Sequence, residues 1–165
     1  MISSLPVEYW QSVNDAVTSN EKHESVWEED FLLGYGPMDD IHREFIELVR
    51  AMQVVPDDEV PAVLDRLAAH TEHHFAEEAA WMSTEGYPAR DCHVDEHDRV
   101  MASMREVQQL VAGGDRAVAR RLARALEDWF PGHATYMDSA LAQWMVKRSA
   151  GGSPIVFKRK KDQET

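Results

Sequence analysis

Apolar residues recur every three or four positions along most of the chain after residue 37, the spacing that lines one face of an α-helix. We expect four such segments to form helices, over residues 38–52, 60–85, 90–112 and 115–148. Glycine and proline interrupt the pattern between segments, and nothing alternates in the manner of a strand. Because the connections are short, the pattern predicts an all-α fold, an antiparallel up-down-up-down four-helix bundle.

The two ends of the chain do not share this pattern. Residues 1–26 are expected to form an N-terminal arm, in which a short helix could begin after Ser4. Residues 149–165 are expected to be a flexible basic tail, which leaves 27–148 for the bundle. The arm lacks the basic start and apolar stretch of a signal peptide. With one cysteine, Cys92, no intrachain disulfide can form, and we therefore expect a cytoplasmic protein.

Charge and hydropathy exclude two kinds of partner. The formal net charge is −13, from 30 acidic and 17 basic residues, and a field of that sign repels the phosphates of nucleic acid. No apolar run approaches the roughly 20 residues that span a bilayer. We expect no nucleic-acid partner and no membrane span.

The predicted inward faces of the four helices carry polar residues of one kind, those that bind metals. Within a helix, His74 and Glu78, and likewise His93 and His97, are four residues apart and point to nearly the same place. The full set is His42, His74, Glu78, His93, His97, His133 and Asp138.

The last predicted helix raises two geometric questions. Its inward stripe reads Val118, Leu122, Leu126, Trp129, His133, Tyr136, Ala140 and Trp144. On a regular helix His133 and Asp138 differ by about 140°, so they reach one site from opposite flanks or through a local distortion. Pro131 lies inside the same segment, and because proline removes a helical hydrogen bond we expect a kink or a break there.

Seven buried polar residues need partners, which they could find in one another or in metal ions. Convergence from four helices favours metal, and seven ligands are too many for one ion that keeps an open position. Two ions bridged by both carboxylates and one solvent-derived oxygen, with three histidines on one ion and two on the other, would be six- and five-coordinate and leave a single vacancy. Imidazole suits iron, copper, nickel or zinc. The Glu-x-x-His motifs of carboxylate-rich bundle oxidases are absent from the sequence.

From Trp27 to Trp144 the sequence resembles the hemerythrin family, particularly its bacterial members. The resemblance is carried in order by Trp27-x3-Phe31-x2-Gly34, Asp39-x2-His42, His74-x3-Glu78-x3-Met82, Tyr87-x5-His93-x3-His97 and Trp129-x3-His133-x4-Asp138. It implies two iron ions, bridged by an oxo or hydroxo group and two carboxylates, and reversible binding of dioxygen. It assigns His93, His97 and His133 to the saturated iron, His42 and His74 to the iron with the vacancy, and Glu78 and Asp138 to the bridges.

The resemblance also implies an apolar pocket for oxygen, although the same side chains could be ordinary core. By position its lining is Phe45, Phe75, Trp129, Phe130 and Ala134. Ala134 stands where the family commonly has a bulky aliphatic residue, which predicts a roomier pocket and faster autoxidation. His70, one turn before His74, could hydrogen-bond behind the ligands or be a structural histidine at the pocket edge.

Three functions remain open at this point. The first is an oxygen carrier, store or supplier. The second is a sensor of oxygen, nitric oxide or redox state that acts through an unknown protein partner. The third is a di-iron redox enzyme, which we rank last because no acid–base residue is evident beyond the seven ligands.

Overall fold

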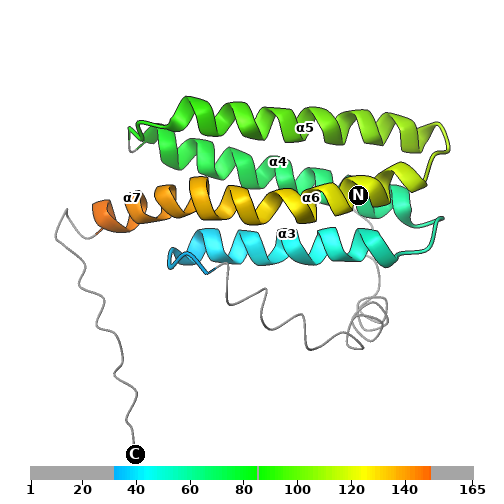
Figure 1. Ribbon diagram of the computed structural model, residues 1–165, viewed down its shortest axis with the longest axis horizontal. Coiled ribbons are helices and arrows are strands. Elements are labelled where there is room, and N and C mark those ends of the chain that lie inside the picture. Colours follow the sequence, from blue (N-terminus) through cyan, green and yellow to red (C-terminus); the bar gives the residue numbers. More distant parts are fainter. Residues whose placement is uncertain (1–31, 85, 150–165) are drawn as a thin grey trace, which may run out of the picture.

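The computed structural model describes residues 32–84 and 86–149 (Figure 1). The predicted arm over 1–26, its short helix after Ser4, and the tail from residue 150 onward lie outside the described residues. The described part of the chain is helical and contains no strand. Its helices are α3 (Gly36–Val54), α4 (Val60–Thr84), α5 (Arg90–Ala112), α6 (Ala117–His133), a π-helical turn η2 (Ala134–Asp138) and α7 (Ser139–Ser149).

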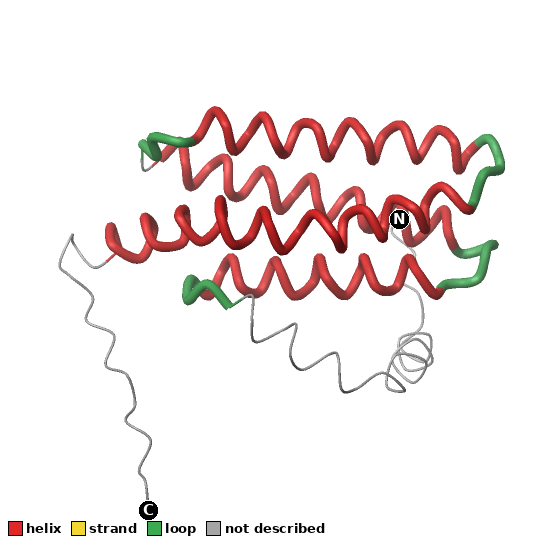
Figure 2. The backbone as a smooth tube through the Cα atoms, in the orientation of Figure 1, coloured by secondary structure: helices red, strands yellow, loops and turns green. Residues whose placement is uncertain are grey.

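The helices form the predicted four-helix bundle. Helix α3 packs against α4 and α6, and α5 packs against the same two helices, so each helix has two neighbours. Figure 2 shows the connecting loops at the two ends of the bundle, as an antiparallel up-down-up-down path requires. Helices α6, η2 and α7 follow one another as the fourth long helix (Figure 1).

Local sequence explains where the helices begin and end. Pro37 lies in the first turn of α3, where its missing N–H is not needed. The Asp39 carboxylate accepts the backbone N–H groups of Leu33 and Gly34, and so ties the incoming chain to the first turn of the helix. After α4, Gly86 adopts φ +62°, a conformation that favours glycine, and the chain reverses into α5.

Of the kink or break predicted at Pro131, the break is wrong. Helix α6 continues through Pro131 to His133, and the irregularity lies directly downstream, in the π-helical turn. There the backbone N–H of Ser139 donates to the carbonyl of Ala134, five residues back, and this bonding adds one residue to the turn. Of the two geometries considered for His133 and Asp138, the structure has the local distortion.

The extra residue also overturns the predicted stripe at Tyr136 and Ala140, whereas Trp144 is half-buried and packs against the smaller of the two apolar clusters. Tyr136 is 81% exposed and Ala140 is exposed. The inward positions shift by one residue, and Leu141, Ala142 and Met145 are buried in their place. A pattern that assumes 3.6 residues per turn throughout cannot predict this shift, because the π turn contains one more residue than an α-helical turn.

The buried residues form two apolar clusters, one toward each end of the bundle. The larger contains Phe45, Leu67, Val107 and Leu126, and the smaller contains Met38, Met82, Leu141 and Met145. On α3, His42 falls between Met38 of the smaller cluster and Phe45 of the larger one, and on α4, Glu78 falls between Phe75 of the larger cluster and Met82 of the smaller one. Of the helices described, none combines the length and apolar character needed to cross a bilayer.

Candidate metal centre

The seven predicted metal-binding residues meet in the layer between the apolar clusters. Each is at most 5% exposed. They come from every long helix: His42 from α3, His74 and Glu78 from α4, His93 and His97 from α5, His133 from α6 and Asp138 from η2. Among the described residues they fall into two groups able to hold a metal ion, which share Glu78.

Glu78 directs its two carboxylate oxygens at different histidines. Oε1 lies 2.9 Å from Nε2 of His74 and 3.7 Å from Nε2 of His42. Oε2 lies 3.2 Å from Nε2 of His93 and 3.5 Å from Nε2 of His97. One carboxylate therefore faces two separate sets of imidazole nitrogens.

Asp138 divides its oxygens in the same way. Oδ2 lies 3.2 Å from Nε2 of His42. Oδ1 lies 3.0 Å from Nε2 of His93 and 3.1 Å from Nε2 of His133. The two carboxylates thus separate the histidines into a pair, His42 and His74, and a trio, His93, His97 and His133.

Several atoms at this centre lack hydrogen-bond partners. Nε2 of His133 lies 2.9 Å from Nε2 of His97 and 3.2 Å from Nε2 of His93, so three ring nitrogens converge on one place. Nε2 of His42, one oxygen of Glu78 and both oxygens of Asp138 have no hydrogen-bond partner in the described part of the chain. Converging imidazole nitrogens and carboxylate oxygens in a buried place suit metal cations. The residues present therefore fit a pair of metal ions.

The electrostatics of the centre also favour positive charge. Burial acts to raise the pKa of Glu78 and of Asp138, but the surrounding histidines hold both pKa values below their usual range. Burial lowers the pKa of His42, yet the nearby carboxylates of Asp138 and Glu78 outweigh it and raise that pKa to about 9. The same balance raises the pKa of His93 to about 9. Two buried carboxylates require compensating cations, as protons on histidine or as metal ions.

His97 differs from its neighbours in this respect. Burial, together with repulsion from His93 and His133, lowers its pKa to about 3. Its ring is stacked on Phe75, with centroids 3.7 Å apart and planes 4° apart. His97 is therefore held as a neutral imidazole, the form that binds a metal.

Aromatic side chains surround the histidine rings. Trp129 stacks on His133 with centroids 4.4 Å apart, and Phe130 meets His42 edge-on at 5.0 Å. Phe45 lies 6.0 Å from the ring of His74, also edge-on. Ala134 is fully buried beside them in the larger cluster. Four of the five residues expected to line an oxygen pocket thus contact histidine rings of the centre, and the fifth, Ala134, follows His133 in the chain.

His70 lies beside the centre, with its ring 6.2 Å from the ring of His74, but it hydrogen-bonds to the backbone rather than to a ligand ring. Its Nε2–H donates to the carbonyl of Ile41, at 3.1 Å, and its Nδ1 lies 3.4 Å from a carboxylate oxygen of Glu44. Nδ1 of His74 has no hydrogen-bond partner in the described residues. His70 therefore joins α4 to the residue that precedes His42.

Sequence reasoning missed Glu96. Its carboxylate accepts the indole N–H of Trp129 at 2.9 Å, and this bond lowers the pKa of Glu96. Glu96 thereby orients the ring that stacks on His133. The available signal was its place between His93 and His97, one residue from the inward stripe of α5.

The fold and the centre define a class of protein: four-helix bundles whose core of histidines and carboxylates can hold a pair of metal ions. Residues 33–145 match the family model described as the hemerythrin HHE cation binding domain. The chain belongs to the hemerythrin family.

Named relatives agree with this assignment. The chain is 40% identical over 122 residues to a bacteriohemerythrin of Ralstonia nicotianae, covering 74% of this chain and 89% of that protein. It is 27% identical to a bacteriohemerythrin of Stenotrophomonas maltophilia, over 71% of this chain and 78% of the other. It is also 27% identical to a hemerythrin of Sipunculus nudus, over 68% of this chain and 87% of the other.

Proposed function

We propose that this protein holds two iron ions and binds dioxygen reversibly at one of them. The observation that carries the proposal is the division of the carboxylate oxygens of Glu78 and Asp138 between two sets of histidines. A carboxylate that faces two sets of nitrogens is suited to bridge two ions. The names of the relatives, hemerythrins and bacteriohemerythrins, support the same activity.

The histidines would divide unequally between the ions. His93, His97 and His133 would hold one iron together with Oε2 of Glu78 and Oδ1 of Asp138. His42 and His74 would hold the other with the remaining carboxylate oxygens. The second iron would have one protein ligand fewer, and its open position is where we place dioxygen.

The iron pair, when bound, supplies the electrons that dioxygen takes up and returns. The protein's own residues hold the ions and keep water away from them. Phe130 and Phe45 contact the rings of His42 and His74, and neither can donate or accept a proton. An apolar lining of this kind disfavours water and ions at the open position. We therefore propose that the protein binds dioxygen rather than catalysing a reaction. It would act in the cytoplasm as an oxygen carrier, store or supplier, and nitric oxide is a second candidate ligand.

The test is an optical spectrum of the iron-loaded protein, cycled between oxygen-free and aerated buffer, with iron content measured on the same sample. We expect about two irons per chain and a visible absorption band that appears with air and disappears on deoxygenation through repeated cycles. Zinc-loaded protein is the control, because Zn²⁺ is not redox-active and should give no such absorption band. A band that never forms, or that decays at once to a stable oxidised state, would contradict reversible binding and favour sensing or redox chemistry.

A further inference from the structure

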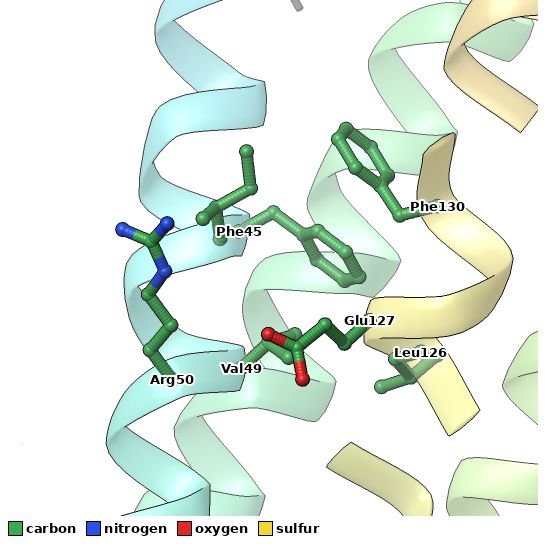
Figure 3. A pocket seen from close by; sticks show the side chains of 7 residues that line it. Phe45, Val49, Arg50, Leu126, Glu127 and Phe130 are labelled. Carbon is green, nitrogen blue, oxygen red and sulfur yellow. The ribbon is translucent and has the colours of Figure 1, made fainter. Parts of the chain in front are cut away.

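A small cavity lies between α3 and α6, one helical turn from the metal centre. Its volume, about 10 Å³, is close to the least that admits a single water molecule. Most of its wall is apolar. The lining residues are Phe45, Ile46, Val49, Arg50, Leu126, Glu127 and Phe130 (Figure 3).

The inner end of the cavity is formed by two phenylalanines. Figure 3 shows Phe45 extending from α3 and Phe130 from α6 toward the same space, and their ring centroids are 5.2 Å apart. The same two rings contact the histidine pair, Phe130 at His42 and Phe45 at His74. One layer of aromatic side chains thus separates the cavity from the histidines of the proposed open iron.

The outer end of the cavity is polar. Arg50 and Glu127 line it there, and both are partly exposed. The side-chain amide of Gln53, on α3, donates to Glu127, on α6, at 2.8 Å. This bond holds the two helices together at the outer end, while the apolar wall begins directly behind it.

This cavity, called the slot below, discriminates between small molecules by their polarity and size. Water and ions lose hydrogen bonds when they enter an apolar space, whereas a small gas molecule without charge or hydrogen bonds loses almost nothing. The cavity is narrow, so passage requires the side chains to move, which rotamer changes permit on fast timescales.

We propose that this slot is the path by which dioxygen reaches and leaves the centre, with the rings of Phe45 and Phe130 as its gate. The proposal rests on the proposed function. It assigns Ile46, Val49 and Leu126 to the wall of the path, a role that none of the seven metal-binding residues shares.

The first test changes the width of the slot at Val49, which is buried in its wall. Val49→Ala should raise both the association and the dissociation rate constants of dioxygen, and Val49→Phe should lower both, by about tenfold, or ~1.4 kcal/mol in barrier height. The affinity should stay the same, because a path changes both barriers equally. Val107→Ala and Val107→Phe are the matched controls, at a buried valine of α5 that does not line the slot, and should leave the rates unchanged. If neither Val49 variant changes the rate constants, the proposed path is overturned, while reversible binding of dioxygen stands. If Val49→Phe does not fold, the rate constants of Val49→Ala alone decide whether the path is correct.

A second measurement does not depend on oxygen binding at iron. In zinc-loaded protein, dissolved dioxygen should enhance the NMR relaxation of the methyl groups of Ile46, Val49 and Leu126 more than that of the buried methyl groups of Val63 and Val107. Equal enhancement in the two groups would overturn the path. If the iron-loaded protein fails to bind dioxygen but the slot methyl groups are enhanced, the proposed function fails and the gas path stands.

Discussion

Nε2 of His133 and Oδ1 of Asp138 lie 3.1 Å apart, although five positions along a regular α-helix would turn them about 140° away from each other. The π-helical turn Ala134–Asp138 resolves this conflict, since bonding between residues five apart brings them to nearly the same face. The same turn sets which residues of α7 face the core. A single extra residue thus serves both the metal centre and the apolar packing beyond it.

The extra residue can be removed to test this relationship. Deletion of Tyr136 would let η2 revert to a regular helix in which Leu141, Ala142 and Met145 still face inward. We expect a protein that keeps its helix content and unfolds cooperatively, but with less bound iron, because ligands must be placed to within about 0.5 Å. Circular dichroism, urea unfolding and iron analysis measure these effects.

The control is deletion of Ala102, an exposed residue in the regular helix α5. That deletion rotates Met104, Val107 and Val111 out of the core by about 100°. It should lower the free energy of unfolding by at least about 3 kcal/mol, since each buried side chain contributes roughly 1.5–3 kcal/mol. If deletion of Tyr136 were equally damaging, the π turn would not be the element that sets the register.

Glu78 offers a test of the bridging arrangement. Glu78→Gln replaces one carboxylate oxygen by an amide that binds metal poorly, so we expect at most one iron per chain in place of two. Glu77→Gln is the matched control, one residue away on α4 and in neither metal-binding group. Iron content after loading and gel filtration is the measurement, and two irons in the Glu78 variant would contradict the bridge.

Ala134 bears on the lifetime of the oxygen-bound form. It is fully buried next to His133, and a larger aliphatic side chain there should exclude water from the pocket. We expect Ala134→Ile to slow autoxidation severalfold, at a stability cost of about 1–3 kcal/mol from overpacking. Ala142→Ile, at a fully buried alanine in the smaller cluster, should cost similar stability and leave autoxidation unchanged. Equal autoxidation rates in the Ala134 variant and the unmodified protein would show that Ala134 does not line the pocket.

The metal-free protein should become less stable as the pH rises from about 6.5 to 9. His42 and His93 have a pKa of about 9 in the folded protein against 6.5 when unfolded, so their stabilising protons are bound below pH 6.5 and lost by pH 9. His97, with a folded pKa of about 3, acts only below this window. The urea midpoint of the metal-free protein should therefore fall across the window.

Metal loading should abolish that dependence, because the ions replace the protons as the partners of Glu78 and Asp138. His73→Asn, at an exposed histidine of α4, is the control and should keep the dependence of the unmodified protein. A urea midpoint that stays constant or rises between pH 6.5 and 9 in the metal-free protein would contradict this account.

The four-helix bundle and the seven site residues could both be predicted from the amino-acid sequence. Apolar spacing is a local property, and it placed the first three helices to within two residues. Pairs such as His74 and Glu78 share a helical face whatever surrounds them, so their convergence could be inferred before any packing was known.

The course of the fourth helix, and the pairing of each carboxylate oxygen with its histidine nitrogens, depend instead on contacts between helices. Pro131 and the spacing of His133 and Asp138 both signalled a distortion, but its position follows from packing against two clusters at once. Across the π turn, α6 faces the larger cluster and α7 faces the smaller one. The hydrogen bond from Trp129 to Glu96 and the slot beside Phe45 and Phe130 likewise arise between helices, where a pattern along one helix carries no information.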